Sequence, residues 1–119
     1  MNGEETKRDL KLRTKQYALR IIRLYSSLET IGAAGVIGRQ LLRSETSVGA
    51  QNREACRARS TAEFISKMES ATQELDESGY WIELLLEARL VEERLLHDLQ
   101  QETDELIAIF VSSAKTAKK

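Results

Sequence analysis

The chain has 119 residues, of which 41% are hydrophobic and 31% are charged, with no proline and a formal net charge of −1. This length fits a single domain, and this composition excludes a disordered chain and disfavours an all-β fold, which needs more turn-forming residues. One cysteine, Cys56, excludes an internal disulfide framework and a zinc site built from several cysteines. Because the first fifteen residues are polar and no apolar run is long enough to cross a membrane, we expect a soluble, cytoplasmic protein.

Charge is distributed unevenly along the chain. Residues 1–60 carry 12 basic and 6 acidic side chains, residues 61–105 carry 3 basic and 13 acidic ones, and residues 106–119 carry three lysines and no acid. Such a chain can either pair with copies of itself or present a basic face locally.

Apolar residues at steps of three and four predict a first helix over about 9–28 and a second over about 33–57. The rows are Tyr17, Ile21, Leu24 and Leu28 in the first helix, and Ile37, Leu41, Ser44, Val48, Gln51 and Ala55 in the second. The second row passes without a break through Ser44–Gly49, whose composition is typical of a turn. We therefore expect this stretch to be helical, and a loop at 44–50 is the alternative.

A third helix over about 61–88 is predicted to begin at Ser60-Thr61-Ala62-Glu63, whose S-x-x-E form is typical of a capping box. A fourth helix is predicted over about 92–114. The rows are Phe64, Met68, Ala71, Leu75, Ser78, Ile82 and Leu85 in the third helix, and Leu95, Leu99, Leu106 and Ile109 in the fourth, interrupted by Glu102. Four helices with short connections predict an all-α fold, an up-down antiparallel four-helix bundle formed by residues 1–119 as one domain.

The third helix carries more apolar side chains than one bundle seam requires. Leu84, Leu85 and Leu86 are consecutive and cover about 200° of the helix circumference. Tyr80 and Trp81 widen this apolar face. We therefore interpret these five residues as a candidate oligomer interface.

No pattern in the sequence is typical of a catalytic or metal site. His97 is the only histidine, and Glu93 precedes it by four residues, so the Glu-x-x-His pairs of a di-iron bundle are missing. We expect His97 to be exposed or partly paired and Cys56 to be a small packing residue, with a reactive thiol as the alternative. The glycine-rich segment 32–38 lacks the spacing of a phosphate-binding loop. We expect no enzyme activity, no metal and no cofactor.

A group of arginines on the second helix and just beyond it could bind nucleic-acid phosphates. The group comprises Arg39, Arg43, Arg53, Arg57 and Arg59, with Lys11 and Lys15 as outlying candidates. Helical spacing projects Arg39, Arg43 and Arg57 to roughly one side. The alternative is a solvated face that pairs with nearby acids.

Several stretches follow one another in an order known from one family. They are Gln40–Ser44, Thr46–Ala50, Arg53–Ala55, Glu63–Lys67, Tyr80–Leu85 and Glu105–Ile109. In these stretches the chain resembles the four-helix bundle family associated with intervening sequences of bacterial large-subunit (23S) ribosomal RNA genes. The family usually has asparagine after the Gly-Ala pair, where this chain has Gln51.

This resemblance implies a homo-oligomer, a pentameric barrel of four-helix bundles, as in the similar accessory proteins of diversity-generating retroelements. Those accessory proteins engage nucleic acid and a reverse transcriptase through basic surfaces, and the resemblance implies no enzymatic activity. The expected partners are therefore copies of the chain itself, RNA or DNA, or a nucleic-acid enzyme, and no membrane. Because this chain is slightly acidic in total, a purely protein-binding oligomer is the alternative.

Overall fold

The computed structural model describes residues 3–119, and their side chains from residue 9 onward. Its helices are α1 (Gly3–Ser27), α2 (Ala33–Cys56), α3 (Thr61–Glu87) and α4 (Glu93–Lys118), and residues 3–119 contain no strand. The predicted all-helical class and the four packed helices are confirmed. Two helices are longer than predicted, since α1 begins before residue 9 and α4 continues past residue 114.

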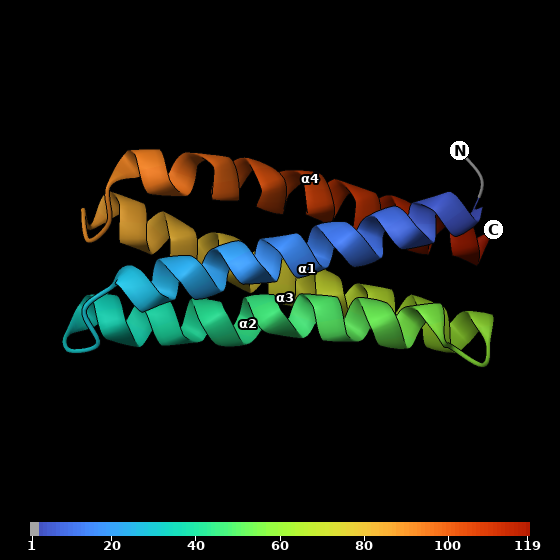
Figure 1. Ribbon diagram of the computed structural model, residues 1–119. Coiled ribbons are helices and arrows are strands. Elements are labelled where there is room, and N and C mark those ends of the chain that lie inside the picture. Colours follow the sequence, from blue (N-terminus) through green and yellow to red (C-terminus); the bar gives the residue numbers. More distant parts are fainter. Residues whose placement is uncertain (1–2) are drawn as a thin grey trace.

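Helices that follow one another in the chain run antiparallel, and the start of α1 and the end of α4 lie at the same end of a bundle about 44 Å long (Figure 1). The helices α2 and α3 pack closely, as do α3 with α4 and α1 with α2, whereas α1 and α4 touch only lightly. The seam between α1 and α4 is therefore the loosest of the four.

The stretch Ser44–Gly49 is helical and lies within α2, so the prediction of an unbroken helix is confirmed. Ser44 and Val48 are fully buried. The Ser44 hydroxyl lies 2.8 Å from the Ser78 hydroxyl of α3, and Gly49 packs against Thr14 of α1. Small side chains at this seam let neighbouring helices approach closely, which explains why turn-forming residues continue a helix here.

The capping box at the start of α3 is present in part. The Ser60 Oγ accepts a hydrogen bond of 3.0 Å from the Glu63 backbone N–H, as predicted. The Glu63 carboxylate accepts one of 3.1 Å from the backbone N–H of Arg59, one residue before the position expected. Both side chains still satisfy backbone donors at the helix start.

The end of α3, for which the sequence offers no glycine or proline, is fixed by a Schellman motif. The Leu90 N–H donates to the Leu85 carbonyl, and the Arg89 N–H donates to the Leu86 carbonyl, both at 3.0 Å. Arg89 has a φ of 57°, in the region that favours glycine. The hydrogen bonds of this motif hold the chain in its turn despite the unfavourable residue.

The core row of α4 differs from the predicted one. The buried residues are Leu96, Leu99, Thr103, Leu106, Phe110 and Ala114, whereas Leu95 is 42% exposed. Thr103 occupies the seam because its hydroxyl is satisfied by the Leu99 carbonyl and the Tyr17 hydroxyl. The core row of α2 also differs from the predicted one, because Asn52 is buried in place of Gln51. Apolar spacing alone does not identify a core position that a polar residue occupies, as at Thr103 and Asn52.

Two glycine substitutions should change stability in opposite directions. A Cβ at Gly35 would overlap the Thr30 carbonyl, so Gly35→Ala should lower the free energy of unfolding by about 2 kcal/mol. A Cβ at Gly79 would meet Thr103 at an ordinary 3.6 Å, so Gly79→Ala should raise it by about 0.5–1 kcal/mol, because alanine favours the helix. Urea denaturation measures both, and equal effects at the two sites would contradict this packing.

Candidate nucleic-acid interface

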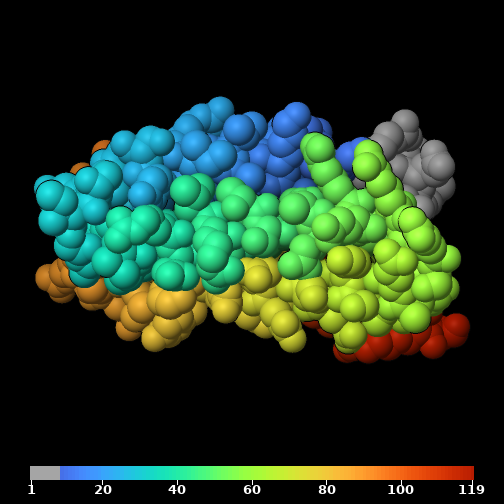
Figure 2. All heavy atoms as spheres, turned by 90° about the horizontal axis from the view of Figure 1, so that it is seen from below, coloured from blue at the N-terminus to red at the C-terminus, as the bar shows by residue number. Residues whose placement is uncertain are grey.

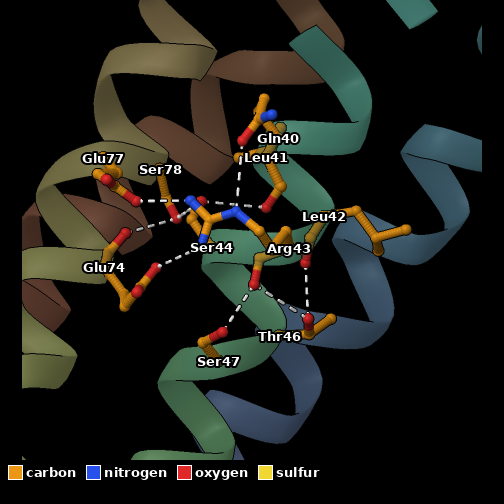
Figure 3. A network of polar contacts seen from close by, with 10 residues as sticks. All are labelled: Gln40, Leu41, Leu42, Arg43, Ser44, Thr46, Ser47, Glu74, Glu77 and Ser78. Carbon is orange, nitrogen blue, oxygen red and sulfur yellow. Dashed lines mark hydrogen bonds and ion pairs between the residues drawn. The ribbon is translucent and has the colours of Figure 1, made fainter. Parts of the chain in front are cut away.

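Arg43, one of the predicted phosphate ligands, is already bound to α3. Its Nη2 lies 2.8 Å from Glu77 and its Nη1 lies 3.4 Å from Glu74 (Figure 3). The hydrogen bond to Glu77 raises the pKa of Arg43, and burial raises the pKa of Glu74. Exposed ion pairs of this kind contribute little to stability. Their consequence here is that Arg43 lies within a local acidic field that repels phosphate.

The other arginines of α2 are in a different environment. Arg39, Arg53 and Arg57 are exposed, and none forms an ion pair with any side chain from residue 9 to residue 119. Only Arg39 makes a weak contact, at 3.3 Å to the Thr30 carbonyl. At 1.5 Å per residue these three span roughly 27 Å of the helix. They follow α2, the green helix that lies between α1 and α3 in Figure 2.

Arg59 lies beyond the end of α2, in the connection to α3. Its side chain is exposed, and its backbone N–H donates to the Glu63 carboxylate at the start of α3. The predicted set of five arginines therefore divides into a line of three along α2, one at the end of this line, and Arg43, which faces the acids of α3.

The outlying lysines of α1 lie beside this line. Tyr25 packs on Gly38 of α2, and Lys11 is separated from Tyr25 by fourteen residues, a nearly whole number of turns, so it lies on the same α2-facing side. Lys15 is one turn further along and is also exposed. We call Lys11, Lys15, Arg39, Arg53 and Arg57 the basic face. Its charges are spaced along two rigid helices, an arrangement suited to phosphate groups.

The predicted oligomer interface on α3 is only partly at the surface. Tyr80 is 54% exposed, and its ring centroid lies 5.2 Å from that of Trp81. Trp81, Leu84 and Leu86 are half-buried. Leu85 is fully buried in the bundle core, so its assignment to a surface was wrong. The turn of the helix directs Leu85 inward while its neighbours on either side keep some exposure.

The family of the chain follows from comparison with known proteins. The family model described as 23S rRNA-intervening sequence protein matches residues 8–112. The chain belongs to this family. A crystal structure of a protein with unknown function from the S23 ribosomal protein family of Bacteroides thetaiotaomicron is similar, with 32% sequence identity and a TM-score of 0.83, over 92% of this chain and 97% of that one. No curated protein matches the chain.

The match confirms the resemblance seen in the sequence. The segment that matches the intervening-sequence family contains all five residues of the basic face and the whole exposed part of α3.

Sequence reasoning missed the most deeply buried acid among the side chains described from residue 9 onward. Glu45 is fully buried, and neither of its carboxylate oxygens has a hydrogen-bond partner among the described residues. Burial raises the pKa of Glu45 to about 8. A pattern was present, since Leu41, Glu45, Val48 and Asn52 also follow steps of four and three. It was overlooked because glutamate and asparagine are uncommon in a core.

The single histidine and cysteine have no shared site. His97 is exposed, and Cys56 is half-buried with a free thiol. Within the part of the chain that the structure describes, no three histidine, cysteine, aspartate or glutamate side chains could together hold a metal ion. None of the helices described is both long enough and apolar enough to cross a membrane.

Proposed function

We propose that this family member is a non-enzymatic, homo-oligomeric accessory protein that binds the phosphate backbone of RNA or DNA through its basic face. The observation that carries the proposal is the line of three α2 arginines without an ion-pair partner among the described side chains. Arginines on a rigid helix can displace counterions from phosphates without a large loss of conformational freedom. Membership of a family described by 23S rRNA intervening sequences supports a nucleic-acid partner.

The distribution of charge would also orient the nucleic acid. Residues 61–105, which form α3 and the first half of α4, carry 13 acidic side chains and would repel phosphates. The basic face, formed by α1 and α2, is therefore a side on which a polyanion can approach. Contacts made to phosphates alone carry no base information, so binding should show no sequence preference.

Oligomerisation would strengthen this weak site. One subunit offers only a few phosphate contacts, and repetition of the basic face in a homo-oligomer, a pentamer by family resemblance, would multiply them. The same assembly would serve as a scaffold for a nucleic-acid enzyme in the cytoplasm. A protein-only scaffold is the alternative, favoured by the pairing of Arg43 with Glu74 and Glu77.

Binding to generic RNA and duplex DNA should depend steeply on salt. With three phosphate contacts per binding event, affinity should fall roughly 40-fold between about 50 mM and about 200 mM salt. The variant Arg39→Ala/Arg53→Ala/Arg57→Ala should lose most of the affinity and most of the salt dependence. Fluorescence anisotropy measures both, with Lys115→Ala as a control that removes a lysine from α4.

Two results would contradict the nucleic-acid role. One is the absence of binding at about 50 mM salt. The other is an equal loss of affinity in the two variants. The α2 variant removes three arginines of the basic face, whereas Lys115→Ala removes one lysine that lies outside it. Either result would leave the protein-only scaffold as the better function.

A further inference from the structure

A groove with basic walls is lined by residues of α1 and α4. These residues lie near the end of α1 and the start of α4, which are at the same end of the bundle (Figure 1). The groove encloses about 330 Å³. Arg20 and Arg23 line it from α1, and neither forms an ion pair with any side chain from residue 9 onward. Arg94 lines it from α4 and binds Glu92 at 2.7 Å. These three arginines and one acid, Asp98, are the charged residues of the lining, so the groove has a net positive charge.

The groove also has an apolar floor. Leu24 and Leu99 form part of its lining and are 7% and 3% exposed, while Leu95 on the wall is 42% exposed. The two helices pack only lightly on each other, so their apolar side chains are not fully covered within one subunit. A positively charged groove with leucines at its base fits an acidic helix that carries apolar side chains.

The outer face of α3 has these properties. Tyr80 is exposed and Leu84 is half-buried, and the exposed carboxylates of Glu83 and Glu87 lie beside them without an ion-pair partner among the described residues. Residues 68–88 contain no basic side chain. We call Tyr80, Glu83, Leu84 and Glu87 the acidic face.

We propose that the acidic face of one copy docks into the α1–α4 groove of the next copy. This inference rests on the homo-oligomer of the proposed function and names the two surfaces that form it. Their charges are opposite, and each has apolar side chains that the single subunit leaves uncovered. Neither surface complements itself, so the contact joins two different surfaces rather than forming a symmetric pair.

The positions of the two surfaces favour a closed ring. The C-terminal ends of α1 and α3 and the N-terminal end of α4 lie at the same end of the bundle (Figure 1). Subunits joined in this way meet at one level along the bundle axis. A contact between two different surfaces repeated at one level can close on itself when the rotation between subunits allows it.

Charge reversal tests the pairing. The groove variant Arg20→Glu/Arg23→Glu and the face variant Glu83→Lys/Glu87→Lys should each shift from the mass of the natural assembly toward the single-chain mass of 13.5 kDa in light scattering. The control Lys11→Glu/Lys15→Glu makes the same charge change on α1, away from the groove, and should keep the natural mass. Circular dichroism should show that all three variants retain their helices.

Recombining the reversed charges should restore assembly. A mixture of the groove and face variants should form complexes heavier than either variant alone, and a chain with all four substitutions should regain the mass of the natural assembly, because opposite charges face each other again. Failure of both rescues would overturn the pairing. So would a natural mass for the groove variant or the face variant alone.

Different results would refute the homo-oligomer and the pairing of its two surfaces. A natural chain that scatters as a 13.5 kDa species would refute the homo-oligomer itself, and the pairing with it. A natural chain that assembles, with variants that assemble equally well, would refute the pairing of these surfaces and leave the homo-oligomer standing.

Discussion

At pH 7 the Glu45→Gln variant should exceed the natural chain in free energy of unfolding by about 3 kcal/mol. The Glu45 carboxyl is fully buried without a hydrogen-bond partner among the described residues, and its pKa in the folded chain is about 8. In the unfolded chain the same group ionises near pH 4.5. Between these two values the folded state holds a proton that the unfolded state releases, so rising pH favours unfolding.

The direction of the Glu45 pKa shift determines the pH range over which the natural chain loses stability. The stability contributed by the neutral carboxyl is fully present below about pH 4.5 and is lost as pH rises toward about 8, at roughly 1.4 kcal/mol per pH unit. Glutamine cannot ionise, so the variant should lack this slope, and the two chains should have similar stability near pH 4.5. Urea denaturation across this range measures the difference.

An exposed glutamate provides the control for this experiment. Glu29→Gln removes one carboxyl from the surface connection between α1 and α2 and should leave the slope of the natural chain unchanged. Parallel curves for Glu45→Gln and the natural chain would show that the Glu45 carboxyl is charged, or reached by water, in the folded protein.

The helices could be predicted from the sequence because apolar spacing reports the buried side of a helix directly. Even the turn-like stretch Ser44–Gly49 was predicted as helix from this spacing. The exact buried row of α4 could not be predicted in the same way. Thr103 enters the core because Tyr17 of a distant helix satisfies its hydroxyl, and that pairing depends on the packed structure.

The sequence predicted that arginines of the second helix form a basic face, but it did not predict which of them are free of ion pairs. Sequence spacing placed Arg43 with Arg39 and Arg57, yet Arg43 is bound to two glutamates of α3 that lie more than thirty residues away in the chain. The groove between α1 and α4 had no sequence pattern at all. It depends on how far two helices from opposite ends of the chain separate, which is a property of packing rather than of local spacing.

Glutamate substitutions at two neighbouring leucines of α3 should have different effects, because one leucine lies in the core and the other lies on the outer side of the helix. Leu85 is fully buried, so Leu85→Glu places a carboxylate in the core and removes its apolar packing, at a cost of about 5 kcal/mol or more. A domain of this size has a total stability of about 5–15 kcal/mol, so the variant should lose much of its helical circular dichroism at 25 °C or unfold at far lower urea.

Leu84→Glu is the matched change one residue earlier. Leu84 is half-buried on the outer side of α3, where the new carboxylate can reach water, so the helices should remain and the urea midpoint should move little. If the acidic face docks into a groove of the next copy, this variant should nevertheless scatter near the single-chain mass of 13.5 kDa, because the carboxylate would have to enter the apolar floor formed by Leu24 and Leu99. Equal loss of helix content at both positions would mean that Leu84 belongs to the core, whereas a folded Leu84→Glu variant with the mass of the natural assembly would remove this leucine from the contact between copies.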